Sequence, residues 1–375
     1  MIYQTPKRTF EHTGYVNPEK SYHVELDRVM NWNNQDMKTM VDVGRYFFIF
    51  SPSQSGKTTF FKMFAQNLET DLNYIFILIS FENCKNYDLE QFYKHIEHIL
   101  YNQLIQRLKD IQCDSLDIVQ SFLNDHTLND SYAFYMLFSH LNQLIRHKKI
   151  VIFIDEFDGI PLHEISNFLT TLRKLYQEYK DKKEKALYSI GLVGVRNITQ
   201  LTVGGVSPFN IADHLELPPF SIKNIRDLYR QYTQETNQAF TDDAVQTIYE
   251  ETQGQPWLVN RIGSIAITKV KPETTQAITD SDIGQAIDIL LEENNMHFDN
   301  LYQKLLLYQG TFKKIMTEEV PHLPDDPSQS FLRQYGLIKN VNKRAVISNP
   351  IYQKRFQSFD TNQFVTANHY LTHPR

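Results

Sequence analysis

The chain has 375 residues, which is too long for one small core, so we expect two or three domains of roughly 150 residues each. A formal net charge of −6 gives the protein no overall attraction to nucleic acid or to an anionic membrane. The two cysteines, Cys84 and Cys113, lie far apart without metal-site spacing, and the N-terminus carries no apolar signal segment. No apolar run is long enough to cross a membrane, so we expect a soluble, cytoplasmic protein without a membrane partner.

Residues 1–40 are polar and are expected to form an irregular N-terminal lead-in. After them, strand-sized apolar runs alternate with stretches of helical periodicity, which is the pattern of a parallel α/β sheet. The predicted strands are 46–50, 74–80, 150–155, 188–193 and 214–217. The predicted helices of this region are 57–66, 89–109, 131–146 and 162–179. We therefore expect residues 41–220 to form one α/β core domain.

The first predicted strand runs into a tight turn and a helix start, which is the context of a phosphate-binding loop. Backbone N–H groups at such a turn point at phosphate oxygens, and Gly56 lets the backbone approach them closely. Lys57 is expected to reach the β- and γ-phosphates, and the Thr58 hydroxyl is expected to ligate Mg²⁺. The usual pattern opens with glycine where this chain has Ser51. The predicted nucleotide-contacting residues of this loop are Pro52, Ser53, Gln54, Ser55, Gly56, Lys57, Thr58 and Thr59.

A second apolar strand, 149–154, runs directly into two carboxylates, Asp155 and Glu156. Its continuous apolar run fits a central parallel strand that is covered on both faces. The carboxyl end of such a strand lies beside the phosphate-binding loop, so Asp155 is predicted to bind Mg²⁺ directly or through water. Glu156 is predicted to act as the general base that polarises the attacking water. Together with Lys57, these residues predict a catalytic site for a nucleoside triphosphate.

Several further positions each have two interpretations. Arg196 and Asn197 follow the fourth predicted strand, where they would either sense the γ-phosphate or belong to an exposed loop. Pro256 would either wedge against the nucleotide base or mark a turn between helices. For Arg173 and Arg261, a solvated helix face is a simpler interpretation than a phosphate contact.

The strands stop at Pro218-Pro219, and the chain after them changes character. Residues 221–297 show only helical patterns and are predicted to form a helical lid domain, with Ser221 as the N-cap of its first helix. Residues 298–360 combine helices with a two-stranded hairpin, an arrangement typical of a winged helix-turn-helix. Residues 361–375 are polar and are expected to form a loosely held tail.

The segment 331–359 is locally basic and contains no acidic residue. It would either contact the phosphates of a DNA backbone or serve as a packing or protein-contact module. The acidic balance of the whole chain favours the second interpretation. The basic residues of this segment are Arg333, Lys339, Lys343, Arg344, Lys354 and Arg355.

On these motifs the chain resembles a family of prokaryotic AAA-like ATPases, which are related to the STAND and origin-recognition-type P-loop ATPases. The resemblance covers nearly the whole chain and rests on residues 13–22, 53–59, 207–211, 252–260 and 349–352. It implies ATP binding at residues 53–59 and a base contact by Pro256. It also implies that Asp155 and Glu156 handle Mg²⁺ and the attacking water.

Three functional hypotheses follow. The main one is an ATP-dependent switch, in which ATP and Mg²⁺ bind between the core and the helical lid and slow hydrolysis resets the protein. Its winged helix would signal to a protein partner or to a second copy of the chain. The alternative is a DNA-associated ATPase, such as a loader or a mobile-element or defence regulator, that contacts nucleic acid through residues 331–359. The third is a scaffold that retains nucleotide for stability without hydrolysing it.

Overall fold

The computed structural model describes residues 2–14, 16–26, 29, 35–52, 54–145, 147–182, 187–194 and 211–357. The chain forms two compact units. The core unit comprises Thr13–Pro18 and His23–Pro219, and the helical unit comprises Met1–His12, Glu19–Tyr22 and Phe220–Arg375. The N-terminal segment therefore contributes residues to both units.

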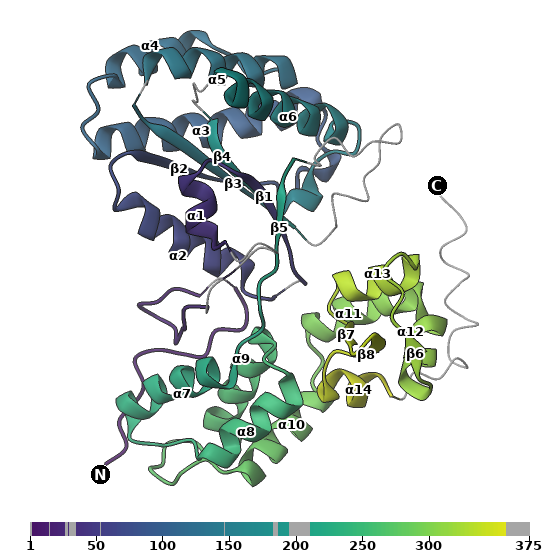
Figure 1. Ribbon diagram of the computed structural model, residues 1–375. Helices are drawn as coiled ribbons and strands as arrows, with labels where there is room; N and C mark the ends of the chain where they lie inside the picture. The colour runs from purple at the N-terminus through teal and green to yellow at the C-terminus, as the bar shows by residue number, and fades with distance from the viewer. Residues whose placement is uncertain are drawn as a thin grey trace, which may run out of the picture. The chain divides into compact units, whose positions relative to one another are not determined.

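The core unit is built on a sheet of five parallel strands (Figure 1). They are β1 Tyr46–Phe50, β2 Tyr74–Ser80, β3 Lys149–Asp155, β4 Leu187–Gly194 and β5 Asp213–Leu215. Their order is β2-β3-β4-β1-β5, so β1 and β3, which carry the two predicted site motifs, flank β4. This arrangement confirms the predicted parallel α/β core, with β5 shorter than the predicted strand 214–217.

Helices cover both faces of this sheet (Figure 1). Because side chains alternate along a strand, Phe48 and Ile152 pack into one helical layer while Phe47 and Phe153 pack into the other. The first layer contains α3 Leu89–Asp110, α4 Leu116–Asp125, α5 Ser131–Leu144 and α6 Ile165–Lys182. The second layer contains α1 Met37–Asp42 and α2 Lys57–Glu69. Helical periodicity predicted α2, α3, α5 and α6, whereas α1 and α4 were not predicted.

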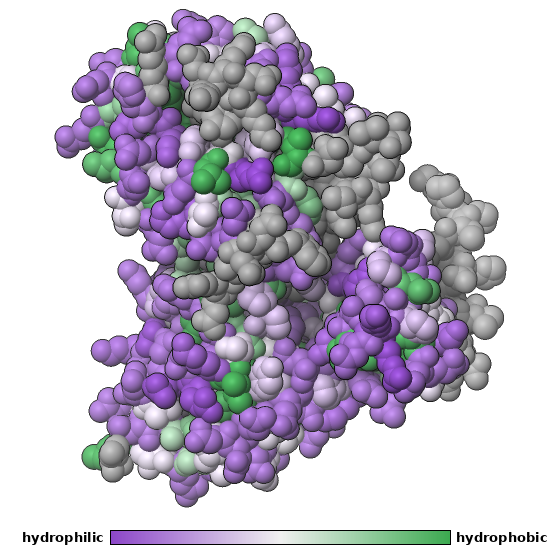
Figure 2. Space-filling view, in the orientation of Figure 1, coloured by the Kyte–Doolittle hydropathy of each residue, from purple (hydrophilic) through white to green (hydrophobic). Residues whose placement is uncertain are grey.

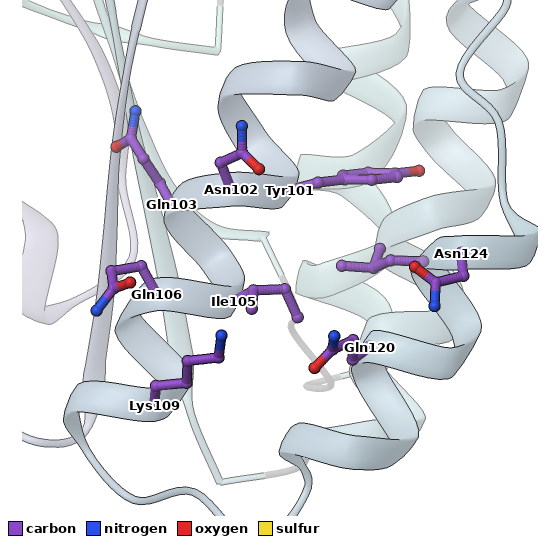
Figure 3. A pocket seen from close by; sticks show the side chains of 9 residues that line it. Tyr101, Asn102, Gln103, Ile105, Gln106, Lys109, Gln120 and Asn124 are labelled. Carbon is purple, nitrogen blue, oxygen red and sulfur yellow. The ribbon is translucent and has the colours of Figure 1, made fainter.

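The outer strand β2 is covered along its edge by side chains of α3. The amide of Gln103 accepts from the backbone N of Leu78 at 2.9 Å and donates to the backbone O of the same residue at 2.7 Å. The guanidinium of Arg107 donates to the backbone O of Tyr74 at 3.3 Å. A groove of about 700 Å³ lies between α3 and α4, and Gln103 and Gln106 are among its polar lining residues (Figure 3). Side chains therefore satisfy backbone groups that an edge strand would otherwise leave to water.

The helical unit contains a group of helices that begins after Pro219. They are α7 Ile222–Thr236, α8 Asp242–Thr252, α9 Pro256–Ile265 and α10 Asp280–Glu292, with a π-helical turn, Ala266–Val270, after α9. The hydroxyl of Ser221 accepts from the backbone N of Asn224 at 3.2 Å, which confirms the predicted N-cap of α7. The N-terminal segment joins this unit through a β-bridge between Thr9 and Ser21.

The last part of the helical unit combines helices with a small antiparallel sheet. Its elements are α11 Met296–Leu307, α12 Gln309–Thr317, β6 Val320–Pro321, α13 Pro327–Gln334, β7 Ile338–Val341, β8 Arg344–Ile347 and α14 Pro350–Phe356. The expected hairpin is β7 with β8, and β6 joins it in the order β6-β8-β7. A helix-turn-helix needs two helices joined by a turn of three or four residues, whereas Tyr308 alone separates α11 from α12, and residues 318–326, which include β6, separate α12 from α13. The winged-helix assignment therefore stays a prediction.

The face of the molecule in Figure 2 is mostly hydrophilic, with small hydrophobic patches. Large hydrophobic side chains that are exposed come from several elements, for example Ile118 on α4, Met296 on α11 and Val341 on β7. Among the helices that the structure describes, none is long and apolar enough to span a bilayer.

Candidate functional site

The loop between β1 and α2 turns into the helix at Gly56. This residue is the N-cap of α2 and has a φ of 85°, in the left-handed region that favours glycine. A Cβ placed on Gly56 would meet no atom within 4 Å, so the constraint is the backbone angle rather than space. The first N–H groups of an α-helix have no intrahelical partner. The turn at Gly56 therefore presents donors suited to an anion.

Lys57 is the first residue of α2, and its ammonium is held inside the loop. Its Nζ donates to the backbone O of Ser51 at 2.8 Å and to the backbone O of Pro52 at 2.7 Å. Burial lowers the pKa of Lys57, while the negative charges of Glu156 and Asp155 oppose that shift. The two present acceptors are neutral carbonyls, and a charged phosphate oxygen makes the stronger hydrogen bond to an ammonium. The loop thus holds a buried cation that an anionic ligand can recruit.

Thr58 and Asp155 bring the two sequence motifs together. The hydroxyl of Thr58 donates to Oδ2 of Asp155 at 2.6 Å, although the residues are 97 positions apart in the sequence. Asp155 is the last residue of β3 and is only 4% exposed, and its Oδ1 accepts from the backbone N of Glu156 at 2.9 Å. In phosphoryl-transfer sites Mg²⁺ is held by a Ser or Thr hydroxyl and a carboxylate, together with phosphate oxygens and water. The donor set of these side chains therefore fits a magnesium ion.

Glu156 follows β3 directly and has a φ of 51°, which is uncommon for a residue with a side chain. The residue is solvent-exposed, yet the protein around its carboxylate removes part of the hydration of that group. This desolvation raises the pKa of Glu156, the charge of Asp155 raises it further, and Lys57 opposes the shift. A carboxylate with a raised pKa is a stronger base, so Glu156 is suited to accept a proton from water.

Two contacts of this site were not predicted from the sequence. The carboxylate of Asp158 lies against the end of β4, since a Cβ on Gly194 would be 2.7 Å from its Oδ2. The backbone N of Ser51 donates to the backbone O of Gly194 at 3.3 Å, which joins the ends of β1 and β4. The sequence signal for a close contact here is Gly194, which follows the fourth predicted strand. A single glycine does not show which residue packs against it, so Asp158 was not predicted.

The other predicted loop residues have different surroundings. Ser55 accepts a hydrogen bond at its Oγ from the Oγ of Ser51 at 2.7 Å, and Gln54 is exposed. The Thr59 hydroxyl accepts from the backbone N of Val16 at 3.1 Å, so it contacts the N-terminal segment. Three predicted site residues lie outside the residues that the structure describes, namely Ser53, Arg196 and Asn197.

The predicted positions on the later helices are held by local contacts. Pro256 is buried as the first residue of α9, and its predicted contact with a nucleotide base stays a prediction. Arg261 forms an ion pair with Glu293, and its guanidinium donates to Nε2 of His12 at 2.9 Å. Arg173 is partly buried on α6 of the core unit.

Five of the six basic residues of segment 331–359 have side-chain partners within the helical unit. Lys354 pairs with Glu251 at 2.8 Å, and Lys339 donates to the side chain of Gln253 at 2.9 Å. The remaining pairs are Arg333 with His322, Arg344 with Glu319, and Arg355 with the ring of Phe298. Lys343 is exposed in the turn between β7 and β8. These contacts support the interpretation of the segment as a packing module.

A sequence model of the AAA-like domain family matches residues 13–358. The fold is similar to that of PABY2304, a Walker-type ATPase of Pyrococcus abyssi, with a TM-score of 0.59 and 11% identity over 89% of this chain and 99% of that chain.

The RuvB Holliday junction branch migration motor of Thermotoga maritima gives a TM-score of 0.41 at 14% identity, over 84% of this chain and 90% of that chain. Cdc6p of Pyrobaculum aerophilum gives a TM-score of 0.43 at 12% identity, over 83% and 87% of the two chains. These two scores are too low to support an argument about this chain. No curated protein matches it in sequence.

Proposed function

Because this chain belongs to the AAA-like domain family, we propose that it binds ATP with Mg²⁺ and hydrolyses it slowly, as a nucleotide-dependent regulatory switch. One observation carries the proposal. The Thr58 hydroxyl and the Asp155 carboxylate lie 2.6 Å apart, within the electrostatic reach of the buried Lys57 ammonium. Together these groups supply what a triphosphate needs, a counter-charge for the phosphates and oxygen ligands for the metal.

In this proposal each residue has one task. The N-terminus of α2 and the Lys57 ammonium bind the phosphates. To do so, Lys57 gives up its hydrogen bonds to the backbone carbonyls of Ser51 and Pro52. Thr58 and Asp155 hold Mg²⁺, which neutralises phosphate charge when it is bound. Glu156 orients a water molecule and accepts its proton. Adenine is preferred over guanine because the sequence contains no Asn-Lys-x-Asp motif of the kind that reads guanine.

The switch role is supported by the division of the chain. The phosphate-binding loop belongs to the core unit, whereas Pro256 belongs to the helical unit. A nucleotide that contacts both units favours one arrangement of them, and about 5.5 kcal/mol of differential affinity takes a population from 1:99 to 99:1. Several charge-assisted bonds to phosphate supply energies of this order. We propose a protein partner or a second copy of the chain as the receiver of this change.

The test compares the parent with Lys57→Ala, using ATP and GTP with Mg²⁺, and measures both binding and phosphate release. We expect Lys57→Ala to weaken ATP binding at least about tenfold, because hydrogen bonds to charged groups are worth about 1.5–3 kcal/mol. Lys62→Ala, on the same helix, serves as the control. Equal ATP binding by the parent and Lys57→Ala would overturn the proposal. ATP that raises the melting temperature without any phosphate release would instead identify a non-hydrolysing scaffold.

We do not extend the proposal to DNA. Five of the six cations in segment 331–359 have partners within the helical unit, so contacts with DNA phosphates would have to displace them. Duplex binding that weakens with salt and with Lys343→Ala would restore the DNA-associated alternative.

A further inference from the structure

The N-terminal segment is anchored firmly to the helical unit by Phe10. This side chain is 3% exposed and packs against Tyr229, Tyr232 and Phe240, with ring centroids 5.2, 5.8 and 6.4 Å away. The backbone of α9 also comes close, since a Cβ on Gly263 would lie 3.3 Å from the Phe10 ring. Aromatic clusters of this kind contribute both buried area and specific ring contacts. Phe10 therefore fixes the segment as part of this unit.

Polar contacts fix the same segment on either side of Phe10. The Arg8 guanidinium and the Tyr22 hydroxyl both donate to the carboxylate of Glu235, at 2.7 and 2.8 Å. The indole N–H of Trp257 donates to the backbone O of His12 at 2.7 Å. Backbone bonds join Thr9 to the segment that returns at 20–22, at 3.0 Å each. The two ends of the intervening loop are thus both held on the helical unit.

The tip of that loop, residues 13–18, belongs to the core unit. There the backbone N–H of Val16 donates to the Thr59 hydroxyl at 3.1 Å. Thr59 lies in the first turn of α2, directly after Thr58, whose hydroxyl bonds to Asp155. The four residue steps from His12 to Val16 span at most about 14 Å. Only these four residue steps therefore link Val16 to His12, which is hydrogen-bonded to the helical unit.

We propose that Thr59 is a positioning residue that couples the phosphate-binding loop to the helical unit through residues 13–18, and this inference rests on the proposed function. Nucleotide binding requires Lys57 and Thr58 to exchange their present partners for phosphate and Mg²⁺. Both residues lie in the first turn of α2, so the exchange changes the position or mobility of that turn. The hydrogen bond from Val16 passes this change to the loop, whose ends are anchored at His12 and at residues 19–22.

The proposal separates the two adjacent threonines by role. The Thr58 hydroxyl donates to a buried carboxylate, whereas the Thr59 hydroxyl accepts from a backbone N–H of another segment. Serine keeps this acceptor and valine removes it while preserving the shape of threonine. Thr59→Ser and Thr59→Val are therefore a matched pair that isolates the hydrogen bond.

The test is amide hydrogen exchange of the full chain, with and without Mg²⁺ and a non-hydrolysable ATP analogue. In the parent we expect the analogue to slow exchange about fivefold or more in peptides from 1–22 and 222–240, the effect of one hydrogen bond of typical strength. Thr59→Ser is expected to keep this response. Thr59→Val is expected to lose it in both peptides, with a smaller loss of affinity for the analogue.

A second variant tests the tether without touching the nucleotide site. Six Gly/Ser residues inserted between Asn17 and Pro18 lengthen the loop at little cost in loop entropy, so analogue affinity should stay within about twofold while the response at 222–240 is lost. If the parent binds the analogue but 222–240 does not respond, or if Thr59→Val and the insertion variant respond like the parent, the coupling is wrong and the proposed function stands. If the parent does not bind the analogue at all, both proposals are wrong.

Discussion

The Thr58 hydroxyl and Oδ2 of Asp155 share a 2.6 Å hydrogen bond that joins the first turn of α2 to the last residue of β3. Asp155 is buried, so this bond satisfies a carboxylate oxygen that water does not reach freely. The same two oxygen groups are the proposed ligands of Mg²⁺. The hydrogen bond therefore already holds the two groups close together, and these same side chains would hold Mg²⁺ in the proposed function.

Thr58→Ala tests this bond in the absence of nucleotide. We expect the variant to lose about 1–3 kcal/mol of unfolding free energy, because a buried carboxylate oxygen loses its donor. Thr58→Ser keeps the hydroxyl and should retain most of the stability. Urea unfolding without Mg²⁺ or ATP measures the difference, and equal midpoints for the two variants would contradict the role assigned to the hydroxyl.

Glu156→Gln separates binding from turnover. The amide keeps the size of the side chain but cannot accept a proton, so we expect phosphate release to fall at least about a hundredfold, the lower end of general-base contributions. ATP affinity should change little. Glu82→Gln is the control, because Glu82 interacts electrostatically with Glu156 but does not follow β3. Unchanged turnover in Glu156→Gln would assign the base to another group.

Gly56→Ala tests the left-handed turn that starts α2. Because φ is 85° there, we expect the alanine variant to lose about 1–2 kcal/mol of stability and to bind ATP more weakly. Gly284→Ala is the matched control, since Gly284 lies in α10 and a Cβ added there would meet no atom within 4 Å. There alanine should raise stability by up to about 1 kcal/mol. Thermal unfolding that moves in the same direction for both variants would refute the backbone argument.

Gln103→Leu tests the covering of β2. The substitution removes the partner of both backbone groups of Leu78, so we expect a loss of about 1–3 kcal/mol in unfolding free energy. Gln106→Leu is the control, because the exposed amide of Gln106 donates to Asp110, one turn further along α3, and its loss should change stability by less than about 0.5 kcal/mol. Both glutamines line the same groove (Figure 3), so each substitution places an apolar side chain in it.

The lowered pKa of Glu293 leads to a prediction of how the stability of the protein depends on pH. Burial opposes its ionisation, but hydrogen bonds from Arg261 and Lys269 outweigh burial and hold the pKa of Glu293 below its ordinary value of 4.5. A carboxyl whose folded pKa is depressed stabilises the protein above pH 4.5, and this stabilisation is lost as the pH falls through the folded pKa. We expect Glu293→Gln to flatten the decline in unfolding free energy between pH 5 and about 3. Glu292→Gln, at an exposed neighbour, should keep the parent slope.

Local patterns in the sequence predicted the elements that carry the site. The apolar run before Ser51, the glycine before Lys57 and the apolar run before Asp155 each determine structure within a few residues. The approach of Asp155 to the phosphate-binding loop was predicted from the topology of a parallel sheet, whereas other contacts between distant segments were not predicted. Thr59 was assigned to the nucleotide, yet its hydroxyl bonds to Val16, 43 positions away, and no local period signals such a pair.

The same reason explains two other differences. The charges of segment 331–359 were visible in the sequence, but their partners, such as Glu251 for Lys354, come from another part of the chain. The helix α4 was not predicted even though Val119 and Leu123 provide its buried face. It is short and amphipathic, and packing against α3 and α5 stabilises it more than its own propensity.

The two margins of the core sheet also bear on how this protein behaves at high concentration. An open strand margin is a template on which another molecule can extend a sheet into an aggregate. Here one margin, β2, has its outward groups at Leu78 and Tyr74 taken by Gln103 and Arg107, and the other, β5, spans only Asp213–Leu215. Within the residues that the structure describes, the side chains on β2 and the shortness of β5 both reduce the backbone that an added strand could pair with.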